Sequence, residues 1–222
     1  MDPLILPTAI AAIISFLICG IPFGLLIASA MNGVDVRKTG SGNIGMTNVA
    51  RSAGGKAAAL TFLLDVGKGV VCVLVSKLVI ANLCLAGDLD MLAHNTAFGW
   101  VGTVVYAACV FGHIFSPYLH FHGGKGISVG LGGGLALYWP LGLSMLGVFL
   151  VLTIPTRYVS LGSIAAAASL PIFGVVYGVQ FVALIPLVLI AVVVIWSHRE
   201  NIGRLMRGEE RRFSIGKDKG GK

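Results

Sequence analysis

The chain has 222 residues, of which 56% are hydrophobic and only 11% are charged, and its mean hydropathy is +0.92. These values exclude an ordinary soluble globular domain and indicate an integral membrane protein. The 31 glycines fit that class, because small residues let transmembrane helices approach each other closely. We therefore expect an all-α membrane fold.

Seven stretches are expected to cross the bilayer, whose apolar core requires about 20 helical residues. They are residues 8–31, 57–85, 96–115, two short helices within 127–155, 158–177 and 181–196. The first stretch has no positively charged leader, which favours a spanning helix over a cleaved signal peptide. The stretch at 127–155 is interpreted as a hairpin with its turn at Tyr138, Trp139 and Pro140.

Lysines and arginines determine the expected orientation. Lys125 and Arg157 flank the hairpin, and the positive-inside rule puts both on the cytoplasmic side, so an even number of crossings separates them. We expect the N-terminus outside and the C-terminus in the cytoplasm. The transmembrane domain is predicted at residues 1–203 and a basic cytoplasmic tail at 204–222. We interpret the tail as a solvated end near anionic lipid headgroups, with no nucleic-acid partner.

Three polar segments interrupt the apolar chain, and all fall on the predicted cytoplasmic side. They are residues 40–51, 120–126 and 198–204, called below the first, second and third polar segments. Each combines glycine with a cation and small hydrogen-bonding side chains, which suits phosphate-like anions. Together they predict one anion-binding site.

The first polar segment, GSGNIGMTNVAR, offers glycine N–H groups, neutral donors and a guanidinium suited to bidentate phosphate binding. Taken alone, it is equally explained as a flexible interhelical loop. Its candidate binding residues are Gly40, Ser41, Gly42, Asn43, Thr47, Asn48 and Arg51.

The second polar segment contains Gly123, Gly124 and Lys125 just before a predicted helix. It lacks the GxxxxGK[ST] spacing, and no magnesium-binding hydroxyl directly follows its lysine, so a nucleotide P-loop is excluded. A lysine at a helix start can still hold a phosphate with the help of the helix dipole. A close helix-packing face is predicted beyond it, at Gly126, Gly130 and Gly134.

The third polar segment places four polar residues at the end of the last span: His198, Arg199, Glu200 and Asn201. His198 and Asn201 share one face if the helix continues. Charges at a membrane edge are also commonly snorkelling groups. That alternative weakens because two further anion-binding segments lie on the same side.

Two further features lie within the predicted spans. Asp65 and Lys68 form an i, i+3 pair, which we interpret as a structural ion pair in preference to a support for the first polar segment. The four cysteines have no metal-ligand or redox spacing and are interpreted as free core thiols. They are Cys19, Cys72, Cys84 and Cys109.

The ordered set GSGNIGMTNVAR with LLDVGKG, GHIFSPYLHFHGGKG, RYVSLGS and HRENIGRLMRGEE resembles the bacterial acyl-phosphate:glycerol-3-phosphate acyltransferase family, PlsY. The resemblance implies a seven-span inner-membrane enzyme whose site faces the cytoplasm. It implies transfer of a fatty acyl group from acyl phosphate to the 1-hydroxyl of glycerol 3-phosphate, giving lysophosphatidic acid, without a cofactor or a covalent acyl-enzyme. Membrane lipids and other phospholipid-synthesis enzymes are further candidate partners.

The resemblance also implies roles for particular residues. The expected catalytic residues are Ser41, Arg51, Lys125, His198 and Asn201. Ser163 is an expected substrate contact, with Ser160 as the competing alignment, and the other residues named in the polar segments are expected to bind substrate. Two departures from the family are Met46, where members often have a small residue, and His122, where a lysine is common.

The proton acceptor and two rival functions stay open. His198 is a candidate base or orienting donor, whereas the resemblance implies that a substrate phosphate takes the hydroxyl proton. No HxxxxD motif occurs at any of the five histidines, and the sequence shows no metal-ligand cluster. The rivals are a transporter of a small organic anion and a scaffold for lipid enzymes. Polar breaks at one interface and the lack of an internal repeat favour the enzyme over the transporter.

Overall fold

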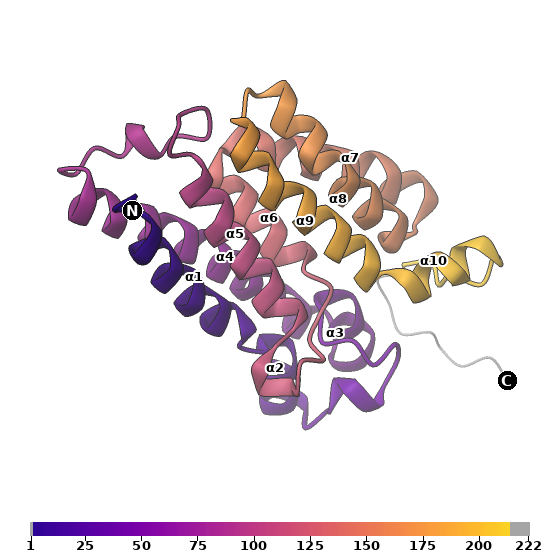
Figure 1. Ribbon diagram of the computed structural model, residues 1–222. Coiled ribbons are helices and arrows are strands. Elements are labelled where there is room, and N and C mark those ends of the chain that lie inside the picture. Colours follow the sequence, from indigo (N-terminus) through magenta and orange to yellow (C-terminus); the bar gives the residue numbers. More distant parts are fainter. Residues whose placement is uncertain (1, 214–222) are drawn as a thin grey trace, which may run out of the picture.

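Residues 2–213 are described by a computed structural model, and within that range all regular secondary structure is helical (Figure 1). The longer helices are α1 (Ile5–Gly20), α2 (Phe23–Asn32), α3 (Met46–Ala53), α4 (Gly55–Cys84), α5 (Trp100–Ile114), α6 (Ile127–Leu137), α7 (Trp139–Thr156), α8 (Val159–Val176), α9 (Phe181–Ser197) and α10 (Arg199–Met206). Single 3-10 turns lie at Val36–Lys38, Asp90–Leu92 and Pro117–Leu119. Each of the seven predicted stretches is therefore largely helical.

Among the described residues, five helical stretches are long and apolar enough to cross a membrane. They are Ile5–Asn32, Gly55–Cys84, Trp100–Leu119, Trp139–Thr156 and Val159–Val176. Helix α9 meets the same standard only together with α10, across a 57° bend. The predicted hairpin is present but unequal, because α7 has 18 residues and α6 only 11, or about 16 Å of helix. Length and composition thus support five or six spans.

The first predicted span, at 8–31, is not one continuous helix. It breaks at Ile21 and Pro22, because proline has no N–H to continue the helical hydrogen bonds. Side chains distant in sequence supply donors for the carbonyls at the break. The Ser116 hydroxyl donates to the carbonyl of Gly20 at 2.6 Å, and the Lys68 ammonium donates to that of Ile21 at 2.9 Å. A break buried among helices needs such partners.

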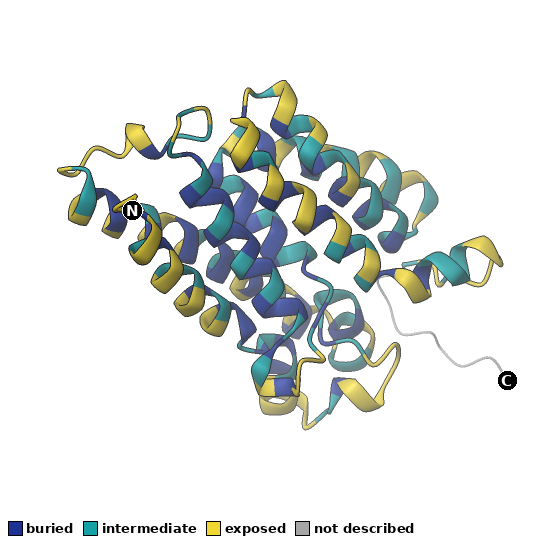
Figure 2. Ribbon diagram, viewed as in Figure 1, coloured by how far each residue is buried: buried dark blue, intermediate teal, exposed yellow. Residues whose placement is uncertain are grey.

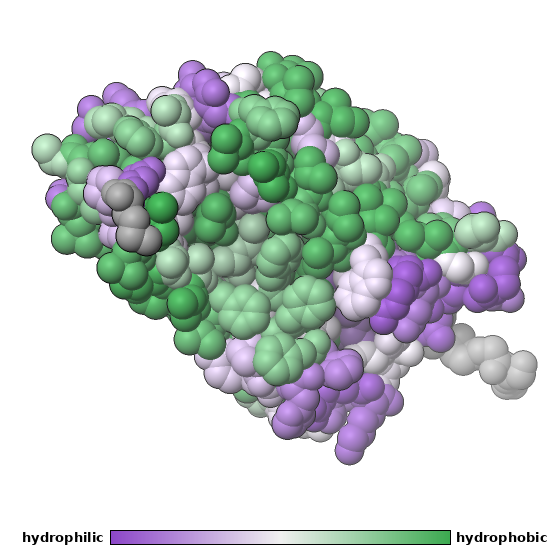
Figure 3. Space-filling view, in the orientation of Figure 1, coloured by the Kyte–Doolittle hydropathy of each residue, from purple (hydrophilic) through white to green (hydrophobic). Residues whose placement is uncertain are grey.

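Helix α5 lies at the centre of the bundle (Figure 1), and it is the most deeply buried of the candidate spans. Figure 2 shows buried residues concentrated in α5 and α6, whereas exposed residues follow the outer sides of α1 and α9. Many of the exposed residues are large and hydrophobic. In Figure 3 they form an apolar band between two more polar ends. This distribution is typical of a protein surrounded by lipid.

Glycines let α6 insert closely between α4 and α5. A Cβ atom on Gly69 of α4 would lie 2.6 Å from the carbonyl oxygen of Val129. A Cβ on Gly132 would overlap the Val66 carbonyl, and one on Gly133 would overlap a tyrosine ring of α5. The predicted packing row is therefore correct only at Gly126, where a Cβ would lie 2.9 Å from a Val110 methyl group. Gly130 and Gly134 keep ordinary contact distances, and the other close approaches fall at Gly132 and Gly133.

The two ends of the bundle have different chemistry. At one end, His94 stacks on Tyr138 with ring centroids 4.0 Å apart, and Tyr138 packs edge-on against Tyr177 at 5.4 Å. The turn between α6 and α7 thus lies beside the loop before α5 and the turn after α8. The three polar segments lie at the other end, near α2, α3 and α10 (Figure 1). This is the relative placement that the hairpin predicts.

Candidate functional site

A cavity of about 560 Å³ connects the three polar segments with the apolar interior of the bundle. Its polar part is lined by side chains of all three segments. Its apolar part is formed by α4 to α9, through residues that include Phe62, Tyr106, Met145, Phe149, Leu170 and Ile190. The arrangement suits a ligand with a polar headgroup and an apolar chain.

Ten of the fifteen residues predicted for the site line this cavity, and five do not. The lining residues are Gly40, Ser41, Asn43, Thr47, Asn48, Arg51, Lys125, Ser163, His198 and Asn201. The residues outside the lining are Gly42, Gly123, Gly124, Arg199 and Glu200. The reasons lie in the local structure of each segment.

The third polar segment does not continue the last span. Helix α9 ends at Ser197, and α10 begins at Arg199 after the 57° bend, so His198 and Asn201 do not share one uninterrupted helical face. Both side chains are nevertheless buried against the cavity. Arg199 instead stacks on the ring of Trp196 at 4.2 Å, and Glu200, whose side chain is 76% exposed, pairs with the cavity-lining Arg204 at 3.9 Å. These two charges therefore lie outside the cavity lining, although Glu200 contacts a residue of it.

In the second polar segment, the glycines shape the loop and the lysine reaches the cavity. The N–H groups of Gly123 and Gly124 donate to the carbonyls of Ile114 and His113, at 2.9 and 3.0 Å. A Cβ on Gly124 would overlap the His113 ring. These contacts fix the loop on the end of α5, so Lys125 enters the cavity directly before α6.

In the first polar segment, Asn48 organises the loop. Its amide nitrogen donates to the carbonyls of Val36, Thr39 and Asn43 at 2.9, 3.1 and 2.8 Å. Its amide oxygen accepts the N–H of Ser41 at 2.9 Å. Asn48 is buried and its hydrogen-bonding capacity is used by the loop itself. Its role here is to hold the glycine-rich backbone in shape.

The start of α3 brings donors to the same cavity. Met46 and Thr47 line it as the first two helical residues, and the N–H groups of a first helical turn have no intrahelical acceptor. One helical turn later, Arg51 also lines the cavity. Within residues 2–213, its guanidinium makes neither a hydrogen bond nor an ion pair with protein. Such groups are well suited to an anion.

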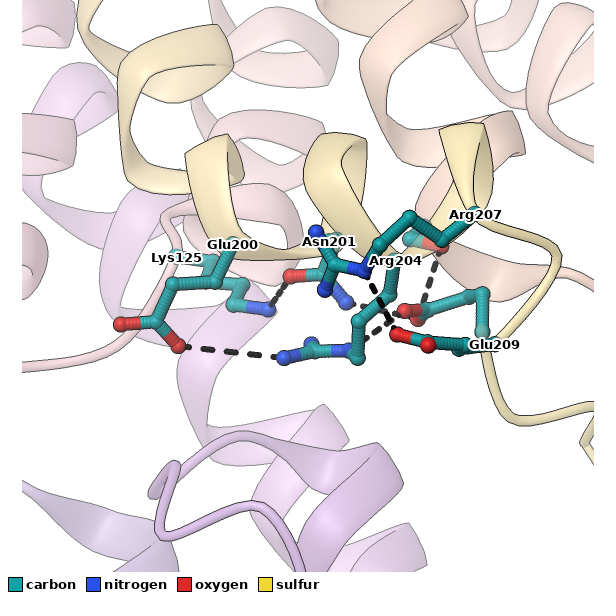
Figure 4. A network of polar contacts seen from close by, with 8 residues as sticks. Lys125, Glu200, Asn201, Arg204, Arg207 and Glu209 are labelled. Carbon is teal, nitrogen blue, oxygen red and sulfur yellow. Dashed lines mark hydrogen bonds and ion pairs between the residues drawn. The ribbon is translucent and has the colours of Figure 1, made fainter.

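A polar network joins the second and third segments to a carboxylate that the sequence prediction missed. The Lys125 ammonium donates to Asn201 Oδ1, and the Asn201 amide nitrogen donates to Glu210 Oε1 at 2.7 Å (Figure 4). Glu210 also accepts from the Ser160 hydroxyl at 3.0 Å and from Arg204 Nε at 2.8 Å. Glu210 thereby connects α8, α10 and the chain after α10.

The predicted boundary at 203/204 therefore cuts through the cavity lining. Arg204, Glu210 and Arg211 line it, although they were assigned to a solvated tail, and the N–H of Phe213 donates to the Arg157 carbonyl at 2.7 Å. Residues 214–222 of the predicted tail lie outside the described residues. The motif HRENIGRLMRGEE runs to Glu210, so the sequence already indicated that the site continues past residue 203.

The two serines left as alternatives both line the cavity but differ in their bonds. Ser160 donates to Glu210 and so belongs to the polar network. Ser163 donates to the carbonyl of Val159, one turn earlier in its own helix, at 2.8 Å.

Burial lowers the pKa values of Lys125 and His198, which face this network. Burial, with the nearby Arg204, lowers the pKa of Lys125 to about 8. Burial also lowers the pKa of His198 to about 4, so its imidazole is neutral at pH 7. His198 Nδ1 lies 2.8 Å from the Val194 carbonyl and is assigned as the N–H donor, which leaves Nε2 as an acceptor. For Glu210, burial opposes ionisation, but hydrogen bonds from Arg204, Asn201 and Ser160 hold its pKa below the ordinary value.

A second charged cluster lies beneath the second polar segment. The Lys68 ammonium is 2.8 Å from Asp65 Oδ1, as an ion pair not aligned as a hydrogen bond, and 3.1 Å from His113 Nδ1. All three side chains are buried. Lys68 also caps the helix break at Ile21, and the His113 ring packs against Gly124. These contacts fit a structural ion pair, and Asp65 and His113 also border the cavity.

The cavity carries more positive than negative charge. Its described lining includes the cations Arg51, Lys125, Arg204 and Arg211 and the carboxylates Asp65 and Glu210. Since Asp65 is paired with Lys68, Glu210 is the remaining carboxylate facing four cations. Such a site favours anionic groups, and more than one can be accommodated electrostatically.

Comparisons with known proteins agree with this site chemistry. A family model described as Glycerol-3-phosphate acyltransferase matches residues 9–208. A glycerol-3-phosphate acyltransferase of Bartonella henselae is 39% identical, over 95% of this chain and 92% of its own. One of Prochlorococcus marinus is 37% identical, over 90% of this chain and 95% of its own.

Solved structures are also similar. A crystal structure of PlsY, an integral membrane glycerol 3-phosphate acyltransferase, in its glycerol 3-phosphate form matches with a TM-score of 0.79 at 35% identity, covering 93% of this chain and 96% of the other. The lysophosphatidic acid form matches with a TM-score of 0.76 at 34% identity, over 94% and 96% of the two chains.

Proposed function

The chain belongs to the glycerol-3-phosphate acyltransferase family, and from this we propose that it transfers a fatty acyl group from acyl phosphate to the 1-hydroxyl of glycerol 3-phosphate. The products are lysophosphatidic acid and inorganic phosphate. The observation that carries the proposal is the single cavity that joins a cation-rich mouth to an apolar interior. Both substrates carry phosphate, and the donor also carries an acyl chain.

The proposed roles divide between the two phosphates and the reacting centre. Arg51 and Lys125, with the first N–H groups of α3, offset the repulsion between the phosphates and stabilise charge on the leaving group. Ser41 of the first polar segment and Asn201 of the third orient the substrates. The apolar residues of α7 to α9 receive the acyl chain. Substrate contacts are further proposed for Gly40, Asn43, Thr47 and Ser163, which line the cavity.

The proposed chemistry is substrate-assisted and uses no cofactor or covalent acyl-enzyme. The 1-hydroxyl oxygen attacks the acyl carbonyl carbon, the bond from that carbon to the phosphate oxygen breaks, and the hydroxyl proton passes to a phosphate oxygen. A base with a pKa near 4 accepts protons poorly at neutral pH, so His198 is better suited to orient the hydroxyl through Nε2.

The proposed setting is the bacterial inner membrane, with the cavity mouth toward the cytoplasm. Seven crossings would place the N-terminus outside and all three polar segments on the cytoplasmic side. The seventh crossing requires α6, whose 11 residues are wedged between α4 and α5 and so are shielded from lipid. Membrane lipids are then the immediate neighbours, and other enzymes of phospholipid synthesis are candidate partners.

The decisive experiment is an assay of the purified protein with acyl phosphate and glycerol 3-phosphate. We expect release of phosphate and formation of lysophosphatidic acid in equal amounts. A folded protein that forms neither product would refute the proposal. Transport of an organic anion into protein-loaded vesicles without product would then favour a carrier, and headgroup binding alone would favour a scaffold.

Replacement of His198 by Gln separates the two roles considered for this residue. Glutamine keeps a hydrogen-bonding side chain but cannot act as a base at neutral pH. If His198 orients the hydroxyl, the variant retains measurable turnover with an unchanged pH profile. A complete loss of turnover in a folded variant would restore His198 as the required base.

A further inference from the structure

Three of the four cysteines, far apart in sequence, meet inside the bundle. Cys19 lies near the end of α1, Cys72 in α4 and Cys109 in α5, and their sulfur atoms all lie within 4.8 Å of one another. The sulfurs of Cys19 and Cys72 are 3.8 Å apart. We propose that these three thiols form a binding site for a soft monovalent metal ion, Cu(I), separate from the catalytic cavity.

The separations match three sulfurs around one ion. With metal–sulfur bonds of about 2.3 Å, the sulfurs of a trigonal site are about 4.0 Å apart. A disulfide would instead require about 2.05 Å between two sulfurs. Small side-chain rotations therefore suffice to close a trigonal site around a metal ion. No other Cys, His, Asp or Glu atom joins the group within the described chain.

Ligand chemistry and coordination number select the ion. Thiol sulfur is a soft donor that favours Cu(I) and zinc over magnesium, calcium and manganese. Structural zinc almost always takes four ligands in a tetrahedron, whereas this group offers three. Cu(I) is satisfied by few sulfur ligands and carries a single charge. A low charge matters here, because Cys19, Cys72 and Cys109 are all buried in the apolar bundle.

Proton release keeps the site neutral. A thiol must lose its proton to become a strong metal ligand. In the proposed step, Cu(I) forms bonds to three sulfurs while one S–H bond breaks and its proton leaves to water. One thiolate is then the strong ligand, two neutral thiols complete the trigonal site as weaker sulfur donors, and the net charge is unchanged. No oxidation or reduction is involved.

A groove gives an ion access to the cluster. It has a volume of about 120 Å³ and lies between α1 and α4. Its lining is apolar except for Ser15, Lys68, Cys72 and Ser76. The groove therefore brings Cys72 close to the lipid-facing surface of the bundle, with the hydroxyl groups of Ser15 and Ser76 beside it. The catalytic cavity does not include any of the three cysteines.

The sequence prediction of free core thiols could not anticipate this convergence. The spacing of the cysteines matches no metal motif, because each comes from a different helix. Cys84 provides a matched control on α4 itself. It lies twelve residues after Cys72, or about 18 Å along the helix, and outside the cluster.

The test uses the purified full-length protein in detergent, without oxygen, with Cu(I) supplied as a complex with a coloured chelator. Wild type and Cys84→Ala are expected to withdraw one Cu(I) per chain. Cys19→Ala and Cys109→Ala are expected to bind at least tenfold more weakly. Acyl transfer by metal-free variants serves as the check that each is folded. Equal binding by all variants, or loss of binding in Cys84→Ala alone, would overturn the proposal.

A second measurement needs no variant. X-ray absorption of the copper-loaded wild type is expected to show three sulfur neighbours at about 2.3 Å. Cu(I) loading is also expected to raise the melting temperature, because the ion binds only the folded arrangement of α1, α4 and α5. Failure of wild type to retain Cu(I), or coordination by oxygen and nitrogen, would overturn the site without affecting the proposed acyl transfer.

Discussion

The protein contains two clusters in which lysine meets carboxylate and histidine, and they differ in charge balance. In the cavity, Lys125 lies with three arginines around Glu210. Beneath the second polar segment, Lys68 is balanced by Asp65 and caps a helix break. Excess charge around a cavity indicates a ligand of opposite charge, whereas a balanced, enclosed pair indicates support of the fold. The contrast predicts losses of activity at the first cluster and of stability at the second.

The largest expected effect is loss of turnover on removing a cavity cation. Lys125→Ala and Arg51→Ala should each reduce kcat/KM by about 10³-fold, because each removes a charge held against the leaving phosphate. Melting temperatures should change little. Lys56→Ala is the matched control, since Lys56 is exposed at the start of α4 and outside the cavity lining. Normal turnover in Lys125→Ala would remove this residue from the site.

Asp65→Asn should primarily reduce stability. It leaves the buried Lys68 charge without its partner, and breaking a buried pair costs about 3 kcal/mol or more. The measurement is thermal unfolding in detergent, alongside kcat of the fraction that stays folded. Replacing both partners together, by Asp65→Leu with Lys68→Met, should recover part of the loss. A stable but inactive Asp65→Asn would instead assign this cluster to the chemistry.

The pH dependence of substrate affinity is a further way to separate the clusters. Lys125, with a pKa of about 8, is charged below that pH and loses its charge above it. The KM for glycerol 3-phosphate should therefore rise above pH 8, by up to about tenfold for each pH unit. Lys125→Arg keeps its charge over this range and should flatten the profile. A rise that persists in Lys125→Arg would point to another group.

Local sequence pattern was sufficient to predict the helical stretches and nine of the cavity residues, because hydrophobic length and glycine-cation segments act over short distances, and the family resemblance added Ser163. It was insufficient where distant parts of the chain meet. Pro22 breaks the first span, and Ser116 and Lys68, distant in sequence, satisfy the carbonyls freed at the break. Glu210 enters the site by turning back after α10 to reach Ser160, 50 residues away.

The same limitation applies within the third polar segment, where residues close in sequence have different surroundings. Arg199 and Glu200 have the residue types of an anion site, but neither lines the cavity, because Arg199 stacks on Trp196 and Glu200 pairs with Arg204 at 3.9 Å. His198 and Asn201 reach the cavity on either side of that bend. A pattern interpreted as one continuous helix cannot distinguish these two pairs, because α10 leaves the direction of α9 by 57°.

The smallest expected effect therefore distinguishes two arginines of α10. Arg199→Gln should stay within about twofold of wild-type kcat/KM, since an exposed cation stacked on Trp196 contributes about 0.5–1 kcal/mol at most. Arg204→Gln removes a partner of Glu210 inside the cavity and should lose more than tenfold. Both are measured in the same phosphate-release assay. Equal losses would mean that Arg199 also acts on the substrates. The distinction between the cavity-lining Arg204 and the exposed Arg199 would then be wrong.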